Sequence, residues 1–382
     1  TFIGWLTAPE IAELSADQEV ANFSVGNPQE MPLPGFVDAL RRAAEPRNKD
    51  WFAYKFSEPE SREVVAAALR EELGIPFDPE DIAMTTGAFG ALATAIQLLI
   101  DPGDEVVINL PPWFFYETMV AGAGGVTVKV AVDRETFDLD LPAIAEAITP
   151  RTRAIVVNTP NNPTGRIYPP ETLERLAAIL TEASARHGRP IWLISDEPYR
   201  RIRFDDIPFH SPLAYYPYSL MTYSYGKILL TPGQRLGYIA LPPTLPNREE
   251  MRQAIQAVQV AGGWLFPNAI MQHAIAELEP MSIDLGVMQR KRDRMVSALR
   301  EIGYDVRSPE GTFYLLPRSP WQDDRAFSLE LARHKLLVLP GSVTEIPGFF
   351  RLSLTASEEM IERSLAGFAA AFARARAEPA HA

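Results

Sequence analysis

Residues 170–199 read PETLERLAAILTEASARHGRPIWLISDEPY, a helical pattern followed at once by an apolar strand. A proline at the start, apolar residues at helical spacing and Gly188 as a stop predict a helix over Pro170–His187. The run Ile191–Asp196 is apolar on both faces, as strands are when helices cover both sides of a sheet. This stretch therefore predicts an α/β fold in which helices connect parallel strands.

Similar apolar runs recur through the middle of the chain. The further strand candidates are Glu105–Leu110, Val126–Val132, Ala154–Thr159, Ser219–Tyr223 and Leu236–Leu241. Helical patterns separate them, and no internal repeat is visible at the periods of solenoids or propellers. We predict a large domain over residues 46–280, built on this sheet.

The flanks have a different pattern. Ser282–Ile302 predicts a long charged helix, with Arg290, Lys291, Arg292 and Arg294 on its solvent-exposed side. After it we expect a helix near Ala326–His334, a short strand at Phe350–Leu354 and a last amphipathic helix after Ser357. These elements predict a smaller α+β domain, formed by residues 1–45 and 281–382.

Composition excludes several classes of protein. The 382 residues carry 36 Lys and Arg against 49 Asp and Glu, a net charge of -13 that argues against nucleic acid and anionic membranes as partners. The absence of cysteine excludes disulfides, thiolate nucleophiles and cysteine-ligated metals. The five histidines are far apart, so no metal site is expected.

Targeting signals are not evident. No apolar run approaches the roughly 18–20 residues of a membrane helix. The first residues, Thr1–Trp5, show no basic region followed by an apolar core. Because the sequence does not begin with Met, a removed leader stays open. We expect a cytoplasmic protein.

Lys227 has an unusual environment in the sequence. It stands in Ser224-Tyr-Gly-Lys-Ile-Leu-Leu230, and no charged residue follows until Arg235. An ammonium group among apolar neighbours loses solvation, so its pKa falls and its amine becomes a nucleophile able to form a Schiff base. A surface lysine at a strand end is the alternative.

Polar groups also follow two of the predicted strands. The segment 159–165, TPNNPTG, forms a fixed turn after an apolar strand, where the ligand crevice of an α/β sheet lies. Asp196 and Glu197 end the next strand, where a carboxylate is costly unless it is paired. A plain turn is the alternative for the first segment. Either a cationic ring nitrogen or an arginine could pair with the carboxylates.

Two further segments could bind anions. Thr85-Thr-Gly-Ala-Phe-Gly90 precedes a helical run, and small residues there expose backbone N–H groups to an anion. Arg351 lies in a short apolar strand, as a bidentate carboxylate clamp or as part of a buried ion pair. Gly122-Ala-Gly-Gly125 lacks the third glycine of a nicotinamide-binding fingerprint.

In order and spacing, these segments resemble the class I/II aminotransferases, pyridoxal-phosphate enzymes of the aspartate aminotransferase fold (fold type I). The segments that carry the resemblance, over nearly the whole chain, are Gly26-Asn-Pro28, Thr86-Gly-Ala88, Pro111-Pro-Trp113, Asn161-Asn-Pro-Thr-Gly165, Ser195-Asp-Glu-Pro-Tyr199, Ser224-Tyr-Gly-Lys227, Gly233-Gln-Arg-Leu-Gly237, Gly311-Thr-Phe-Tyr314 and Arg351-Leu-Ser353. The resemblance implies a large domain with a mainly parallel, seven-stranded sheet between helices, and a smaller α+β domain.

The resemblance also implies catalytic roles. Lys227 would form a Schiff base with pyridoxal 5'-phosphate and shuttle the proton during the reaction. Asp196 would keep the pyridine nitrogen protonated, so that the ring stays an electron sink. Asn162 and Tyr199 would hydrogen-bond the phenolic oxygen of the ring.

The remaining cofactor contacts are implied in the same way. Trp113 would stack on the ring face. The backbone amides of Gly87 and Ala88, together with Ser224 and Arg235, would hold the phosphate.

For the substrate, the resemblance assigns the α-carboxylate to Arg351, helped by Asn162 and the backbone of Gly26. The implied reaction is transamination: an L-amino acid gives its amino group to the cofactor, and a 2-oxo acid then takes it. The apolar stretches Phe2–Trp5 and Ala261–Phe266 indicate a hydrophobic or aromatic amino donor. Packing between domains is the alternative explanation for both stretches.

Several alternatives remain open at this stage. Members of the family are homodimers with shared active sites, and the tyrosine that reaches the neighbouring phosphate is here replaced by Phe52 or shifted to Tyr54. Another reaction of the same cofactor, such as β-elimination, cyclisation or oxidation, is the first functional alternative. A regulator that uses the fold as a ligand sensor is the second, and the acidic charge opposes it.

Overall fold

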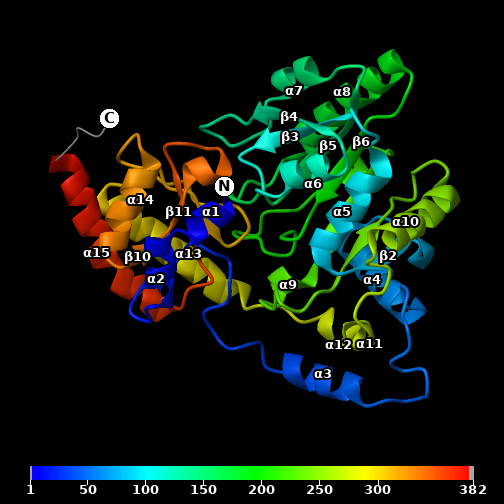
Figure 1. The fold of residues 1–382 in the computed structure, drawn as a ribbon, viewed down its shortest axis with the longest axis horizontal. Helices are drawn as coiled ribbons and strands as arrows, with labels where there is room; N and C mark the ends of the chain where they lie inside the picture. The colour runs from blue at the N-terminus through cyan, green and yellow to red at the C-terminus, as the bar shows by residue number, and fades with distance from the viewer. Residues whose placement is uncertain (1, 378–382) are drawn as a thin grey trace.

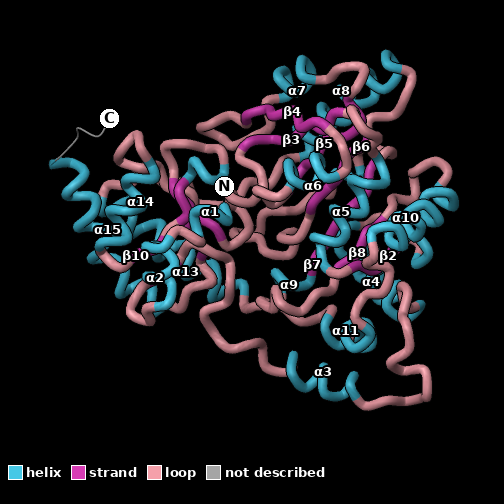
Figure 2. The backbone as a smooth tube through the Cα atoms, viewed as in Figure 1, coloured by secondary structure: helices cyan, strands magenta, loops and turns pink. Residues whose placement is uncertain are grey.

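The computed structural model describes residues 2–377, which are built around a seven-stranded sheet with the order β2-β8-β7-β6-β5-β3-β4 (Figures 1 and 2). Its strands are β2 (Ile82–Thr85), β3 (Glu105–Leu110), β4 (Val126–Ala131), β5 (Thr152–Asn158), β6 (Trp192–Asp196), β7 (Ser219–Ser224) and β8 (Gly237–Ala240). Strands β3 to β7 run parallel, and β8 is antiparallel to both of its neighbours. This confirms the predicted α/β class and the mainly parallel sheet.

Helices cover both faces of the sheet (Figure 1). The covering helices are α7 (Leu141–Ala147) and α8 (Pro170–His187) on one face, and α5 (Gly87–Leu99), α6 (Tyr116–Gly122) and α10 (Arg248–Gly262) on the other. Along β5, Ile155 and Val157 belong to the core under α8, whereas Val156 belongs to the core under α5. Because successive side chains point to opposite faces, a central strand such as β5 is buried on both sides, whereas the edge strand β4 carries the partly exposed Lys129.

One short strand escapes the sequence pattern. β2 has only four residues, Ile82–Thr85, and it pairs antiparallel with β8 at the edge of the sheet. So short a run of uncharged residues does not separate a strand from a buried helical turn. The other six strands lie within two residues of their predicted ends.

Both ends of the chain meet in a second group of elements, on the left in Figure 1. Its strands are β1 (Ala21–Asn22), β9 (Tyr314–Leu315), β10 (Leu336–Leu337), β11 (Leu339–Pro340) and β12 (Phe350–Ser353). Its helices are α1 (Phe2–Leu6), α2 (Pro9–Ala16), α13 (Leu285–Ile302), α14 (Asp324–Arg333) and α15 (Glu358–Ala377). β1 pairs in parallel with β10, so the chain's first strand is held by a strand from its C-terminal part.

The remaining helices complete the fold. They are α3 (Phe36–Ala44), α4 (Pro59–Leu73), α9 (Tyr225–Ile228), α11 (Ala269–His273) and α12 (Ile275–Leu278), with 3₁₀ turns at Pro79–Asp81, Pro212–Ala214 and Gly341–Thr344. Helix α3 lies against α11 and α12. The predicted boundaries of the two domains, 46–280 against 1–45 and 281–382, stay a prediction.

The prediction for the exposed side of α13 is wrong at two of its four residues. Arg290 and Arg294 are exposed, but Lys291 and Arg292 are buried. The Lys291 ammonium group donates to Glu30 over 2.9 Å, and Arg292 forms an ion pair with Asp205. Long basic side chains can bury their stems on a helix face when a carboxylate meets the charged end, which a helical pattern alone does not reveal.

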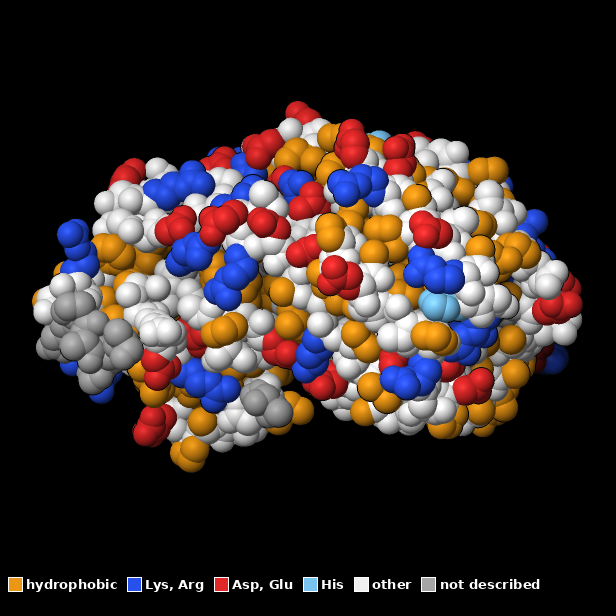
Figure 3. All heavy atoms as spheres, turned by 90° about the horizontal axis from the view of Figure 1, so that it is seen from above, with side chains coloured by type: hydrophobic (Ala, Val, Ile, Leu, Met, Phe, Trp, Pro, Cys, Tyr) orange, Lys and Arg blue, Asp and Glu red, His pale blue; other side chains and the backbone are white. Residues whose placement is uncertain are grey.

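The surface shows no concentration of basic charge on the face seen in Figure 3, where acidic and basic side chains are interspersed. This mixture agrees with the net acidic composition. Within residues 2–377, no helix is both long and apolar enough to cross a membrane.

Candidate active site

A pocket of about 210 Å³ opens at the carboxyl ends of β5, β6 and β7. Its lining residues are Ala88, Phe89, Leu92, Trp113, Asn158, Asn162, Asp196, Pro198, Tyr199, Ser224, Gly226, Lys227, Pro232 and Arg235. Parallel strands bring the loops that follow them to one edge of the sheet, which is where ligands of α/β proteins bind. Eight of the eleven predicted site residues therefore meet in one pocket, although they lie up to 147 positions apart between Ala88 and Arg235.

Lys227 stands on α9, directly after β7. Its Nζ atom lies 5.5 Å from the ring centroid of Tyr199 and 5.8 Å from that of Phe313. Among residues 2–377, no carboxylate forms an ion pair with this ammonium group, yet its charge lowers the pKa of Asp196. The lysine therefore faces the pocket with its amine available, rather than lying on the surface.

Asp196 is buried at the end of β6 and has three polar neighbours. Its Oδ1 accepts a hydrogen bond from Thr222 over 3.0 Å, and its Oδ2 accepts one from the Tyr116 hydroxyl. The Asn158 amide reaches Oδ2 over 3.3 Å. Burial raises the pKa of Asp196 to about 6, while the bonds from Tyr116 and Thr222 lower it. No arginine among the described residues pairs with it, so a cationic ring nitrogen remains the fitting partner.

Glu197 points to the other side of the sheet. Its Oε1 accepts hydrogen bonds from Ser195 and Ser211, over 2.8 and 2.6 Å. Its Oε2 is buried without a hydrogen-bond partner in the described structure. Burial raises the pKa of Glu197 to about 7, and the charge of Arg200 opposes this rise. The two adjacent carboxylates thus have separate roles: Asp196 serves the pocket, and Glu197 lies in the core.

Arg235 stands in the loop between α9 and β8, and its side chain lies against the start of α5. Gly87, the first residue of that helix, has a φ of +78°, and a Cβ there would lie 2.8 Å from an Nη atom of Arg235. The Arg235 side chain is exposed and donates to the Pro232 carbonyl oxygen over 2.6 Å, desolvation of the guanidinium lowers its pKa, and no carboxylate in residues 2–377 pairs with it. A phosphate group at this helix N-terminus, near Ala88 and Ser224, would supply the missing charge.

Arg351 is buried behind the pocket. It donates to Asn162 Oδ1 and to the Ser24 carbonyl oxygen, each over 3.0 Å, and its guanidinium lies 4.2 Å from the ring centroid of Tyr314. Its Nε has no hydrogen-bond partner in the described structure. Of the two predictions for Arg351, the buried ion pair is absent from residues 2–377, and the carboxylate clamp fits.

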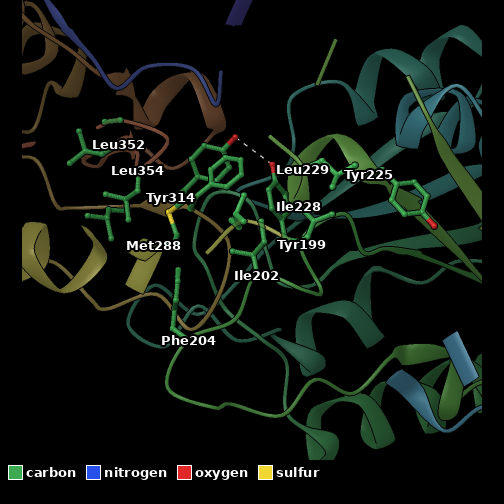
Figure 4. Packing of buried hydrophobic residues seen from close by; sticks show 14 of the residues in the cluster. Tyr199, Ile202, Phe204, Tyr225, Ile228, Leu229, Met288, Tyr314, Leu352 and Leu354 are labelled. Atoms are coloured by element: carbon green, nitrogen blue, oxygen red, sulfur yellow. Dashed lines mark hydrogen bonds between the residues drawn. The ribbon is translucent and has the colours of Figure 1, made fainter. Parts of the chain in front are cut away.

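Tyr314 links the remaining predicted residues. Its hydroxyl accepts a hydrogen bond from Tyr199 over 3.4 Å, and Figure 4 shows the two rings meeting at their polar ends. A Cβ on Gly26 would lie 2.5 Å from the same hydroxyl. Only a glycine therefore lets the N-terminal segment approach this group.

Four functional candidates were missed by the sequence reasoning. They are Tyr116, Asn158, Thr222 and Tyr314. Two of them had an available signal, because Tyr314 ends the segment Gly311–Tyr314 that carries the resemblance, and Tyr116 stands one turn after Trp113. Asn158 and Thr222 had none, since their contacts to Asp196 join separate strands.

Phe52 and Tyr54 lie outside the pocket. Their exposed fractions are 55% and 83%, and the Tyr54 ring packs 4.8 Å from the ring of Phe266. Which of the two reaches a neighbouring phosphate stays a prediction. Two serines that follow this segment have local roles: Ser57 accepts from the Met84 amide, and Ser61 donates to the Gln272 carbonyl oxygen.

Comparison with known proteins agrees with this geometry. Residues 18–368 match the family model for aminotransferase class I and II. The aspartate/prephenate aminotransferase of Thermus thermophilus is 32% identical over 368 residues, which cover 94% of this chain and 92% of that relative. The chain belongs to the class I and II aminotransferases. The family uses pyridoxal phosphate as its cofactor.

Solved structures give the same fold for this aminotransferase. An amino transferase from Eubacterium rectale superposes with a TM-score of 0.91 at 28% identity, covering 97% of each chain. The Thermus thermophilus aspartate aminotransferase with maleate has a TM-score of 0.82 at 29% identity, covering 97% of this chain and 98% of that one.

The residues present fit pyridoxal phosphate. The aminotransferase offers an amine at Lys227, a buried carboxylate at Asp196 and, at Arg235, a pocket-lining guanidinium that has no carboxylate partner within residues 2–377. These three groups match the aldehyde, the ring nitrogen and the phosphate of the cofactor in chemical type. The aromatic face of Trp113 lines the same pocket.

Replacing Glu197 by glutamine is expected to change the pH dependence of stability. Because the folded-state pKa is raised from 4.5 to about 7, the stability that this carboxyl contributes is present below pH 4.5 and is lost as the pH rises to about 7. A glutamine side chain does not titrate, so Glu197→Gln should gain on the order of 3 kcal/mol relative to the wild type across this window. Guanidinium unfolding at pH 4.5 and pH 8 measures the gain.

The matched control for this prediction is Glu60→Gln, on the exposed side of α4. Its difference from the wild type should be the same at both pH values. An equally constant difference for Glu197→Gln would contradict the assigned burial of a protonated carboxyl.

Proposed function

We propose that this aminotransferase moves the amino group of a hydrophobic or aromatic L-amino acid to a 2-oxo acid, with Lys227 as the reacting amine. The observation that carries the proposal is that Lys227 and Asp196 line one pocket, while Arg351, from a third strand, donates to Asn162 in the wall of the same pocket. Each of these side chains is costly to bury alone, and each gains a partner from the cofactor or the substrate.

Pyridoxal phosphate, when bound, supplies the electron sink for breaking a bond at the substrate α-carbon. Lys227 carries the proton, because its Nζ can take it from the α-carbon and return it to a neighbouring position. Asp196 would hold the proton on the ring nitrogen through its carboxylate. Tyr199 and Asn162 would donate hydrogen bonds to the phenolic oxygen.

Arg351 orients the substrate. Its bonds to Asn162 and to the Ser24 carbonyl fix the guanidinium plane, and its stacking on Tyr314 fixes the tilt. If the substrate α-carboxylate binds this guanidinium through two hydrogen bonds, the orientation of the substrate is fixed. That orientation determines which substituent of the α-carbon faces Lys227.

An aromatic wall extends from Arg351 to the mouth of the pocket. The Phe114 ring centroid lies 5.9 Å from the Arg351 guanidinium, and the ring of Phe2 on α1 stacks on the Phe114 ring at 3.8 Å. Trp113 lies 6.1 Å from Phe114 and 5.3 Å from Phe89, which is 44% exposed at the mouth. A substrate side chain along this wall would meet ring faces, which supports a hydrophobic or aromatic donor.

Aspartate is the second candidate donor. The names of the relatives favour it, since they include aspartate/prephenate aminotransferases. The cationic groups that line the pocket in the described chain are Lys227 and Arg235, and both are assigned to the cofactor. The pocket walls of this chain therefore support the hydrophobic donor. β-Elimination, cyclisation and oxidation are the alternative reactions of the same site.

We also propose that a second copy of the chain covers an aromatic patch, defined as Phe52, Tyr54, Phe56 and Phe266. The exposed fractions of these side chains are 55%, 83%, 48% and 43%. The Phe266 ring lies 4.8 Å from Tyr54 and 5.3 Å from Phe56, so these three rings are contiguous, and Phe52 stands two positions before Tyr54. Exposed aromatic clusters of this kind mark interaction surfaces. A cytoplasmic location stays a prediction.

Lys227→Ala is expected to lower amino transfer by at least about 10²-fold, because no other lysine among residues 2–377 lines the pocket to move the proton. Formation of a 2-oxo acid from a donor measures the rate, and circular dichroism should show an unchanged fold. Lys335→Ala, which removes a surface lysine paired with Glu19, is the control and should keep full activity. Normal rates in Lys227→Ala would sink the proposal.

A panel of amino donors is expected to show higher kcat/KM for phenylalanine, tyrosine and leucine than for aspartate, by about 10-fold or more. Phe89→Ala should reduce the value for phenylalanine while leaving that for alanine, which has no long side chain to contact the wall. The accumulation of pyridoxamine phosphate distinguishes transamination from the other reactions. Higher kcat/KM for aspartate would favour the second candidate donor.

Replacing two rings of the aromatic patch, in the double variant Tyr54→Ser and Phe266→Ser, is expected to weaken association of the chain with itself. Loss of the buried ring area should raise the dimer dissociation constant by at least about 10-fold, as light scattering over a dilution series would show. Val126→Ser is the control, because it removes an exposed apolar side chain on β4, outside the patch. A monomeric wild-type protein would contradict the proposal.

A further inference from the structure

Tyr116 contacts Asp196 from a helix that the catalytic prediction did not include. Its side chain is 2% exposed, and its hydroxyl donates to Asp196 Oδ2. The residue begins α6, where its backbone N–H donates to the Trp113 carbonyl oxygen over 3.2 Å. The rings of Tyr116 and Trp113 lie 5.4 Å apart, so one turn of chain carries both the ring-face residue and the donor to the carboxylate.

The donors around Asp196 come from separate elements. Thr222 on β7 serves Oδ1, while Asn158 on β5 reaches Oδ2 only over 3.3 Å. Two other titratable groups interact electrostatically with this carboxylate. The charge of Lys227 on α9 lowers the pKa of Asp196, and the charge of Asp196 raises the pKa of Tyr199, which follows β6. Tyr116 is therefore the closer of the two donors to Oδ2.

We propose that Tyr116 is a positioning residue, which keeps Asp196 ionised and aimed at the ring nitrogen of pyridoxal phosphate and thereby sets how tightly the chain binds that cofactor. The inference rests on the proposed function, since it requires the cofactor in this pocket. A hydrogen bond to a carboxylate favours its charged form, and only the charged form can hold the proton on a pyridine nitrogen.

Burial works against this charge. It raises the pKa of Asp196 to about 6, and the Tyr116 hydroxyl is one of the two hydrogen bonds that oppose it. Without the hydroxyl, the carboxyl would become protonated at a higher pH. The phenyl ring of Tyr116→Phe would still fill the same space beside Trp113, so packing would be retained.

The decisive comparison uses two ligands that differ at one atom. Apoprotein is titrated with pyridoxal phosphate and with its analogue in which carbon replaces the ring nitrogen, and tryptophan fluorescence reports binding. Tyr116→Phe should bind pyridoxal phosphate about 10-fold more weakly than the wild type and bind the analogue equally well. The wild-type affinity for pyridoxal phosphate should fall as the pH drops through about 6, and in Tyr116→Phe this fall should begin at a higher pH.

Two further variants complete the test. Tyr304→Phe is the matched control, because it removes a buried hydroxyl that donates to the Phe368 carbonyl oxygen near α15, and it should leave both affinities unchanged. Thr222→Val removes the donor to Oδ1 and should show the same selective loss for pyridoxal phosphate.

The possible results distinguish a failure of the positioning role of Tyr116 from a failure of the proposed function. An equal loss of affinity for both ligands in Tyr116→Phe would overturn the positioning role, because it would show a general packing defect. Unchanged affinity for both would also overturn it. A wild-type apoprotein that binds neither ligand would overturn the proposed function and this inference together.

Discussion

The structure depends on burying a carboxylate at the end of a central strand. Asp196 ends β6, the middle strand of the seven, and is 4% exposed. Such a group is stable only where other elements bring donors to it, and here β5, β7 and α6 each supply one. The parallel arrangement makes this possible, because the ends of β5, β6 and β7 lie side by side. The chemistry of the pocket thus depends on the order of the strands, because only neighbouring strands can bring the donors on β5 and β7 to Asp196.

At the same edge of the sheet, charged side chains with different roles point in different directions. Asp196 and Glu197 are adjacent, and the alternation of side chains along the chain sends one to the pocket and the other to the core. The two arginines of the site are separated as well: Arg235 meets the start of α5, whereas Arg351 reaches the pocket from β12. The phosphate end and the carboxylate end of the site are therefore built by different parts of the chain.

The elements from the two ends of the chain complete the substrate side. β1 pairs with β10, which places the segment after β1 beside Arg351, where the Ser24 carbonyl accepts from the guanidinium. α1 brings Phe2 onto Phe114. A movement of these terminal elements relative to the large sheet would change the carboxylate clamp and the aromatic wall together, while leaving the hydrogen bonds of Asp196 to Tyr116, Asn158 and Thr222 in place.

The sequence by itself determined the α/β class, most strand positions, helix α8 and eight of the residues that line the pocket, because apolar runs, turn residues and short motifs are local properties that can be recognised without a structure. Only the tertiary structure decided which distant residues contact these elements and site residues. Tyr116 reaches Asp196 across 80 positions, Arg351 reaches Asn162 across 189, and Lys291 is buried by Glu30 across 261. Such contacts depend on strand order and on the meeting of the chain's two ends, and no local pattern encodes either one.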